Sequence, residues 1–312
     1  MELNQRFTSF LSKSKSIIGD FLLFDSPKRK MPKSDVRIFA DGCQSARLRI
    51  SEVAFKLAQA KTRKMYPEHE GLLSSGMFEC RIQISGTLRK AVAQTTCSSS
   101  PHYSGASRKM ASDWSLLGSN FEYRADYWKG TPELRELTIT ALEESVGTKH
   151  LYSSLSALAG YHVVRSDLSV TLGVTRGENS NSQWHLDSFH PVIKGFIAID
   201  DIAEDDAQFQ YVVSSFGDRR LIRDIHRNWI LTKQYLKWSG SPRLSPTQVM
   251  HIRKQQVFSM AGHAGTTVFA NTSGVHRKGP DQSGRERWLI GLEVRRRGPI
   301  QSLSRLVFRT YG

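Results

Sequence analysis

The sequence predicts a mainly β protein with helical additions, in which short strands form a barrel or a sandwich. From Tyr161 onward, short segments of alternating apolar and polar residues follow one another at close intervals, a succession typical of such folds. Before that point, apolar residues recur at helical spacing, so we expect helices to support the β core. A chain of 312 residues is long enough to bury a sizeable core.

This change of pattern divides the chain into three regions. They are a basic amphipathic segment and linker (1–35), a helix-rich supporting region (36–160) and a β core (161–312) with an insert near 217–255. In the first region apolar residues fall at three-and-four spacing beside Lys13 and Lys15. This pattern predicts either a helix docked on the core or peripheral contact with a membrane surface.

The supporting region contains three predicted helices or strands with clear boundaries. Residues 51–65 read as a helix with a basic exposed face, and residues 78–84 alternate as a short strand. Residues 132–146 have Thr131 as a plausible N-cap and Pro132 at the first helical position, so they predict a helix. A further helix is expected near residues 149–159.

The β core begins with alternating segments at 161–165 and 168–176, and another strand is predicted at 209–213. Residues 219–238 are helical or irregular and rich in bulky side chains. One interpretation is ordinary core packing of an inserted helix. The other is an insert over the barrel mouth, where loops are free to shape a substrate pocket.

Composition and charge narrow the class of protein only partly. Lys and Arg number 44 against 29 Asp and Glu, a net charge of +15 that attracts nucleic acid, anionic lipid or acidic metabolites without choosing among them. Because this charge is spread along the chain, no specific nucleic-acid site is expected.

Cys43, Cys80 and Cys97 lack CxxC spacing and are interpreted as reduced thiols of a cytoplasmic protein. No apolar run approaches the roughly eighteen residues of a membrane-spanning helix.

A candidate metal site lies in the stretch QWHLDSFHPVIKGFIAIDDI. Because side chains alternate along a strand, His185 and Asp187 are expected to point the same way. His276, after an apolar run and a turn, is the best third ligand. Two histidines and one carboxylate with open positions favour non-haem Fe(II). The alternative is a core histidine and a capping Asp, but polar side chains pointing into an apolar barrel would each cost roughly several kcal/mol without partners.

Neighbouring charged and polar residues are harder to assign. Arg287 begins a probable strand and shares a face with Leu289 and Gly291, while the residues between them form an apolar face that packs elsewhere. His190 completes a local HxDxxH pattern, but Pro191 is expected to turn it away from the metal, towards substrate or a metal ligand. Lys194 could add a cation to the same cavity, but alternation does not settle its direction.

The motifs WHLDSFHP, GVHRKGP and RERW resemble the iron(II)/2-oxoglutarate-dependent dioxygenases, specifically the phytanoyl-CoA hydroxylase-like branch, over residues 161–297. The resemblance implies a double-stranded β-helix of the jelly-roll, cupin-like class. It also implies that His185, Asp187 and His276 are catalytic metal ligands for Fe(II), and that Arg287, eleven residues after His276, binds the distal carboxylate of the co-substrate 2-oxoglutarate. Lys278 stands where this branch has a small residue.

The implied reaction is hydroxylation of an unactivated C–H bond of a small-molecule metabolite, with succinate and CO2 as co-products. Related halogenases have a small residue at the carboxylate position, so Asp187 favours hydroxylation. Two alternatives are a nucleic-acid dealkylase with the same iron chemistry and a non-catalytic jelly-roll binding module. RERWLIGLEVRRR lacks the arginine and asparagine spacing associated with the dealkylases. The sequence names neither the substrate nor the oligomeric state.

Overall fold

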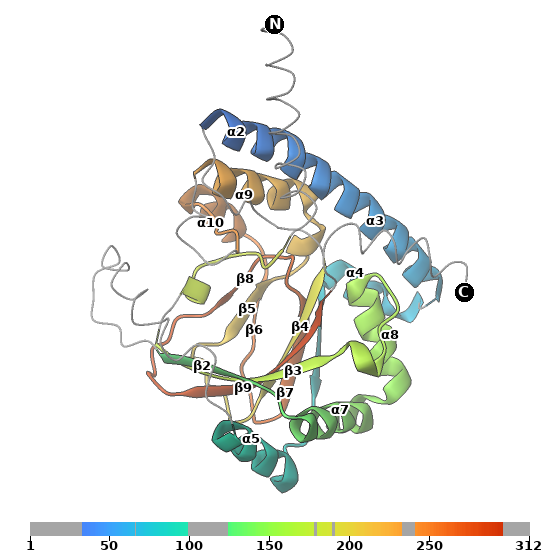
Figure 1. The fold of residues 1–312 in the computed structure, drawn as a ribbon, viewed down its shortest axis with the longest axis vertical. Coiled ribbons are helices and arrows are strands. Elements are labelled where there is room, and N and C mark those ends of the chain that lie inside the picture. Colours follow the sequence, from blue (N-terminus) through green and yellow to red (C-terminus); the bar gives the residue numbers. More distant parts are fainter. Residues whose placement is uncertain are drawn as a thin grey trace, which may run out of the picture.

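The computed structural model describes residues 33–65, 67–98, 124–177, 180–188, 191–232 and 241–295. Two antiparallel sheets occupy the centre of this part of the chain, and helices surround them (Figure 1). The predictions for the amino-terminal amphipathic segment and for His190 concern residues outside the described ranges.

The larger sheet has six strands in the order β1-β7-β4-β9-β3-β2, and every pair is antiparallel. Its strands are β1 (Met77–Arg81), β2 (Arg124–Lys129), β3 (Ser169–Arg176), β4 (Val192–Ala198), β7 (Thr266–Asn271) and β9 (Arg287–Arg295). The smaller sheet has the order β6-β5-β8, with β5 (Phe209–Val212), β6 (Val257–Ser259) and β8 (His276–Lys278). Strands that are neighbours in space are therefore far apart in sequence.

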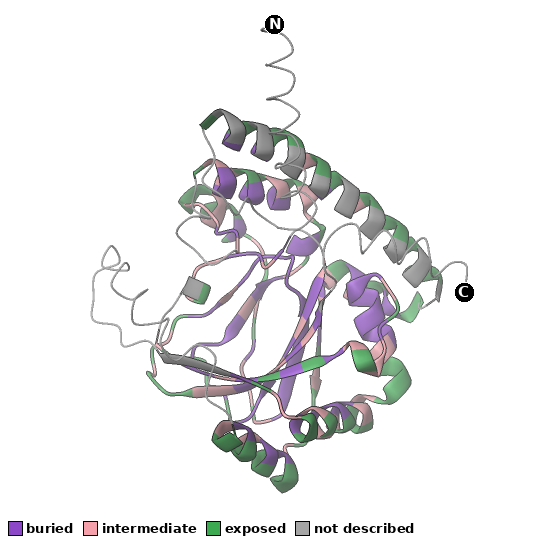
Figure 2. Ribbon diagram, in the orientation of Figure 1, coloured by how far each residue is buried: buried purple, intermediate pink, exposed green. Residues whose placement is uncertain are grey.

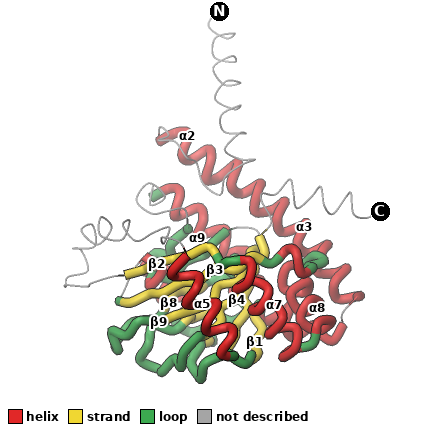
Figure 3. The backbone as a smooth tube through the Cα atoms, turned by 60° about the horizontal axis from the view of Figure 1, so that its bottom comes forward, coloured by secondary structure: helices red, strands yellow, loops and turns green. Residues whose placement is uncertain are grey.

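The helices form two groups. The described α-helices are α2 (Lys33–Ile38), α3 (Gln44–Met65), α4 (Glu70–Ser75), α5 (Gly86–Ser98), α7 (Pro132–Val146), α8 (Thr148–Ala159), α9 (Arg219–Leu231) and α10 (Pro246–Ile252). Helices α5, α7 and α8 lie against the large sheet, α2, α9 and α10 gather at the other side of the molecule, and the long α3 runs from α9 to α8 (Figures 1 and 3). Thr131 caps α7 as predicted, since its side chain accepts a hydrogen bond from the Leu134 amide.

The main core lies between the large sheet and its covering helices (Figure 2). On β9, Ile290, Leu292 and Val294 are buried on this face, as the alternation predicted. Leu151 and Leu155 of α8 are fully buried in the same cluster. Each such side chain contributes about 1.5–3 kcal/mol by leaving water. This layer fixes the sheet, so the opposite face of the same strands is presented at a defined position.

The predicted fold class is confirmed. Two antiparallel sheets face each other with helices outside, the arrangement of a jelly roll, although the strands do not close into a barrel. Strands β1 and β2, from the region predicted to be helix-rich, form the two edges of the large sheet. The large sheet thus crosses residue 160, and the division into domains stays a prediction.

Two local predictions need correction. Residues 161–165 do not form a strand: the chain turns through a 3-10 helix at Arg165–Asp167, and the Asp167 side chain accepts a hydrogen bond from the Val164 amide. Short-range hydrogen bonding by an aspartate competes here with strand pairing. Residues 183–202 do not form one strand either. His185 makes isolated bridges, and the strand proper is β4.

The helical part of the insert shows the first of the two roles considered from the sequence, and its part in a substrate pocket stays a prediction. Ile222, Ile225, Trp229 and Ile230 of α9 are fully buried in core clusters, so the helix itself is ordinary packing. Ser241, where the described chain resumes after Thr232, lines the cavity described below.

Of the cysteines, Cys80 and Cys97 are free. Across the described residues, no helix combines the length and apolar character needed to cross a bilayer.

Candidate metal centre

Backbone pairing brings the first histidine to the second. His185 and His276 exchange both of their amide hydrogen bonds, with N–O distances of 2.9 and 3.0 Å. The Asp187 amide donates to the Thr272 carbonyl at 2.9 Å, so Asp187 is held to the loop that precedes β8. Residues 185–187 are thus hydrogen-bonded to β8 and to that loop without forming a regular strand. The two segments are about ninety residues apart in sequence.

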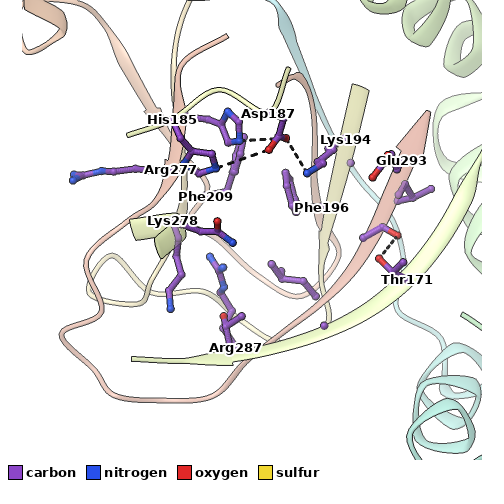
Figure 4. Close-up of a pocket in the computed structure, with 18 of the residues that line it drawn as sticks. Thr171, His185, Asp187, Lys194, Phe196, Phe209, Arg277, Lys278, Arg287 and Glu293 are labelled. Carbon is purple, nitrogen blue, oxygen red and sulfur yellow. Dashed lines mark hydrogen bonds and ion pairs between the residues drawn. The ribbon is translucent and has the colours of Figure 1, made fainter. Parts of the chain in front are cut away.

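The three predicted ligands converge. One ligand atom from each of His185, Asp187 and His276 lies within 4.8 Å of the others. The Nε2 atom of His276 is 3.5 Å from Oδ2 of Asp187, and Nε2 of His185 is 4.0 Å from Oδ1 (Figure 4). Both histidines are 4% exposed, and their ring centroids are 4.2 Å apart. The cluster is therefore compact and shielded from water.

Hydrogen bonds orient both imidazoles. Nδ1 of His185 lies 2.7 Å from the Gln183 carbonyl, and Nδ1 of His276 lies 3.0 Å from the Gly274 carbonyl. A carbonyl only accepts, so each Nδ1 carries the proton and donates it. Each Nε2 is then left with a lone pair directed towards Asp187. This is the arrangement by which metal-ligating histidines are usually held.

Gly274 is needed for this geometry. A β-carbon at this position would collide with the Tyr211 hydroxyl and lie 2.9 Å from Oγ of Ser215. The carbonyl that orients His276 therefore belongs to a residue that packs against Tyr211 with no room for a side chain.

The local charges favour the protonation states that a metal requires. Burial opposes ionisation of Asp187, but the positive charge of the neighbouring Lys194 acts against it, and the pKa of that carboxyl is held well below its usual value. Burial lowers the pKa of His185 well below its usual value, and the neighbouring Arg243 and His276 act in the same direction. An ionised carboxylate and a neutral imidazole are the forms that bind metal.

The donor set fits a divalent transition metal. Two imidazoles and one carboxylate on one side leave the remaining positions open, a set typical of non-haem Fe(II). Oδ2 of Asp187 is buried and has no hydrogen-bond partner among the described residues, although it forms an ion pair with Lys194 at 2.8 Å and lies 3.5 Å from Nε2 of His276. A metal ion would give this oxygen a ligand bond in addition to that ion pair.

A cavity of about 590 Å³ opens from the cluster along the inner face of the large sheet. This volume falls within the range of small-molecule sites. His185, Asp187, His276 and Arg287, the four predicted site residues, all line it. Arg287 reaches into the cavity from the first position of β9, opposite the histidine cluster (Figure 4).

Two further side chains stand beside Arg287. Thr175 is its partner across the β3–β9 pairing, so the two share a face. Oγ1 of Thr175 is buried and has no hydrogen-bond partner in the described part of the chain. Lys278 lies two residues after His276 on β8, is 5% exposed, and donates to the Gly177 carbonyl. These groups surround one end of the cavity with hydrogen-bond donors.

Two other arginines are directed elsewhere. Arg285 precedes β9 and pairs with Asp206 through contacts of 3.2 and 2.8 Å. Arg277 points away from the cavity (Figure 4), and its guanidinium lies 4.4 Å from the ring centroid of Trp184. The choice of Arg287 over Arg285 therefore agrees with the geometry.

Sequence reasoning missed Thr175, Ser241 and Arg243 and left Lys194 undecided. Alternation could place Thr175 on the face of β3 that it occupies, but its position beside Arg287 depends on strand register. Arg243 lies across a β-bridge from His185, in a segment with no strand pattern of its own. No signal in the sequence separates it from the other arginines of a basic chain.

No family model and no curated protein matches the sequence. Among solved structures, the chain resembles the epimerase SnoN in complex with Fe3+, alpha ketoglutarate and nogalamycin RO (11% identity, 75% of this chain and 83% of that chain, TM-score 0.39). It also resembles the non-heme alpha ketoglutarate dependent carbocyclase SnoK from nogalamycin biosynthesis (17%, 71% and 80%, 0.38) and EctD from S. alaskensis with bound Fe (11%, 73% and 75%, 0.40).

SnoN and SnoK are of the iron, 2-oxoglutarate-dependent class that the sequence motifs resemble. Their names do not single out the phytanoyl-CoA hydroxylase-like branch, which stays a prediction. At such identities and TM-scores the likeness assigns neither a reaction nor a substrate to this chain.

Proposed function

We propose that this protein is an Fe(II)/2-oxoglutarate-dependent dioxygenase that hydroxylates an unactivated C–H bond of a small-molecule metabolite, releasing succinate and CO2. The observation that carries the proposal is the convergence of His185, Asp187 and His276 with both Nδ1 atoms tied to carbonyls. The chemistry of this donor set leaves three sites of an octahedral metal open, two for a chelating co-substrate and one for oxygen.

Arg287 and Thr175 would hold the far carboxylate of 2-oxoglutarate. The guanidinium presents planar donors that match a carboxylate in two parallel hydrogen bonds. The Thr175 hydroxyl, buried on the same face with no hydrogen-bond partner among the described residues, can donate a third. In the family that the motifs resemble, the residue at the Lys278 position is small and belongs to the binding site of 2-oxoglutarate. In this chain we assign its contact with the far carboxylate to the hydroxyl of Thr175.

Lys194 and the apolar wall position the reacting groups. The Lys194 ammonium lies 2.8 Å from Oδ2 of Asp187, so it keeps that carboxylate ionised and restricts its rotation. Phe196, Phe209 and Leu289 line the space between the histidines and Arg287 and exclude water from it. When bound there, iron and 2-oxoglutarate supply the oxidising power for C–H hydroxylation. The chain itself binds, orients and shields.

The test is a two-stage measurement on the full chain. Anaerobic titration should give one Fe(II) per chain and, with iron present, one 2-oxoglutarate. A screen of candidate metabolites should then show succinate formation that depends on iron and increases with the right substrate. Iron binding without any 2-oxoglutarate binding or succinate formation would contradict the proposal and favour a non-catalytic binding module.

A further inference from the structure

Arg243 is a buried arginine beside the candidate metal centre. It is 3% exposed, and Nε and Nη1 of its guanidinium are buried with no hydrogen-bond partner among the described residues. Buried charges are normally paired, because an unpaired one carries the full cost of leaving water. Two of its guanidinium nitrogens are therefore left without a hydrogen-bond partner in the described structure, although the carboxylate of Asp187 acts on its charge.

The backbone sets the direction of this side chain. Arg243 and His185 form an antiparallel bridge, flanked by hydrogen bonds from the Leu186 amide to the Pro242 carbonyl and from the Leu244 amide to the Trp184 carbonyl. Residues opposite each other in such a bridge put their side chains on one face. Ser241, two residues earlier and hence on the same face, lines the cavity. Arg243 thus leaves the backbone on the cavity side, next to His185.

The side chains around the cavity carry a net positive charge, which favours binding of an additional anion. Three positive side chains, Lys194, Lys278 and Arg287, and two negative ones, Asp187 and Glu293, line the cavity, while the guanidinium of Arg277, at the same wall, is directed outward. Arg243 is not one of the lining residues, but it lies across the bridge from His185, and with it the excess is two positive charges. Fe(II) and the 2-oxoglutarate dianion carry opposite and equal charges, so loading the site with both leaves this excess of two positive charges unchanged. Arg287 is matched by the co-substrate, but Arg243 lies on the histidine side of the cavity and is not.

We propose that Arg243 binds an anionic group, a carboxylate or a phosphate, of the organic substrate and thereby holds the substrate next to the metal. This inference rests on the proposed function and specifies its substrate class. The guanidinium offers planar donors of the geometry that both anions accept. It lies on the insert, outside the strands that form the metal and co-substrate sites, in keeping with a role in substrate choice.

The experiment uses the full chain loaded with Ni(II) and saturated with 2-oxoglutarate, which prevents turnover. Inorganic phosphate and acetate are the probes, and binding is measured by calorimetry. The variants are Arg243→Met, Arg243→Lys and, as a matched loss of charge at an exposed position of the same insert, Arg253→Met. Nickel and 2-oxoglutarate affinities are measured for each variant before the probes are added.

We expect Arg243→Met to weaken probe binding by about ten- to a hundredfold, the loss of one or two charge-assisted hydrogen bonds. Arg243→Lys should fall between, Arg253→Met should match the wild type, and 2-oxoglutarate affinity should not change. The metal-free Arg243→Met protein should melt no lower than the wild type, because an apolar replacement of an unsatisfied buried charge is neutral or stabilising.

Three results would overturn the inference. Equal probe binding by wild type and Arg243→Met would show that the anion binds elsewhere, for example on the metal. A fall in 2-oxoglutarate affinity with unchanged probe binding would assign Arg243 to the metal-proximal carboxylate of the co-substrate and leave the proposed function standing. Failure of the wild type to bind nickel and 2-oxoglutarate would overturn the proposed function and this inference together.

Discussion

The two faces of strand β9 have opposite tasks. Ile290 and Val294 point into the helix-covered core, whereas Arg287, Leu289 and Gly291 line the cavity. On the core face, apolar side chains pack against the covering helices. On the cavity face, hydrogen-bond donors such as Arg287 face an open volume. Since one backbone serves both, changes on one face should alter stability and changes on the other should alter ligand binding. This separation can be tested residue by residue.

The largest effect is expected at the metal ligands. His185→Ala or Asp187→Ala should reduce iron from one per chain to almost none, because two remaining ligands bind a divalent metal weakly, while the chain stays folded. Metal content and circular dichroism check this. His263→Ala is the control, since that histidine is exposed and pairs with Asp201. Full iron content in both ligand variants would refute the triad.

Arg287→Ala should come next. Removing this guanidinium leaves a buried carboxylate of 2-oxoglutarate unpaired, at a cost of roughly 3–5 kcal/mol. That corresponds to an increase of about a hundredfold or more in the 2-oxoglutarate dissociation constant of the iron-loaded protein. Arg285→Ala should change it little, because Arg285 pairs with Asp206 instead. Equal effects of the two substitutions would show that the co-substrate is bound differently.

Ile290→Ala tests the core face. The side chain is fully buried between the sheet and the helices, so the substitution should lower the free energy of unfolding by about 2–5 kcal/mol. Urea denaturation of the metal-free protein measures this. Iron stoichiometry of the folded fraction should be unchanged. Loss of iron at unchanged stability would break the proposed separation between the two faces.

Thr175→Val tests the cavity face without changing side-chain shape. It should weaken 2-oxoglutarate binding about tenfold, the effect of one lost hydrogen bond to a charged group. Because the Oγ1 atom has no partner in the described structure, stability of the metal-free protein should not fall. Unchanged affinity together with lower stability would show that the hydroxyl is structural.

The smallest effect concerns the Asp206–Arg285 pair outside the cavity. Burial raises the pKa of Asp206, but hydrogen bonds from Ser283 and from the Ala203 amide and the pairing with Arg285 outweigh it, so the pKa is lower than its usual 3.8. A lowered folded-state pKa stabilises the protein above pH 3.8, and this contribution is lost as the pH falls towards the lower value. Asp206→Asn should remove on the order of 1 kcal/mol at neutral pH. The difference from the wild type should shrink in acid, and a difference independent of pH would exclude the ion pair as its cause.

Local sequence rules predicted the parts of the fold that local physics governs. The α7 helix begins and ends as its Thr131 cap, its Pro132 and its periodicity indicated. Alternation along β9 assigned Arg287 to one face and Ile290 to the other. Residues 161–165 failed because a local aspartate turn replaced strand pairing. Edge strand β2 was missed because its existence depends on pairing with β3, a contact that no local pattern encodes.

By itself, the sequence predicted the chemistry of the site: two histidines and a carboxylate as metal ligands from their pattern, and, through the resemblance to a family, an arginine for a co-substrate. Only the tertiary structure places Thr175 and Arg243 beside the site, because their neighbours come from strand register and from a bridge between segments more than fifty residues apart. It also shows that Lys194 turns towards Asp187. Residue type and spacing can be taken directly from the sequence. Which charges meet in a buried cavity depends on how distant segments pair.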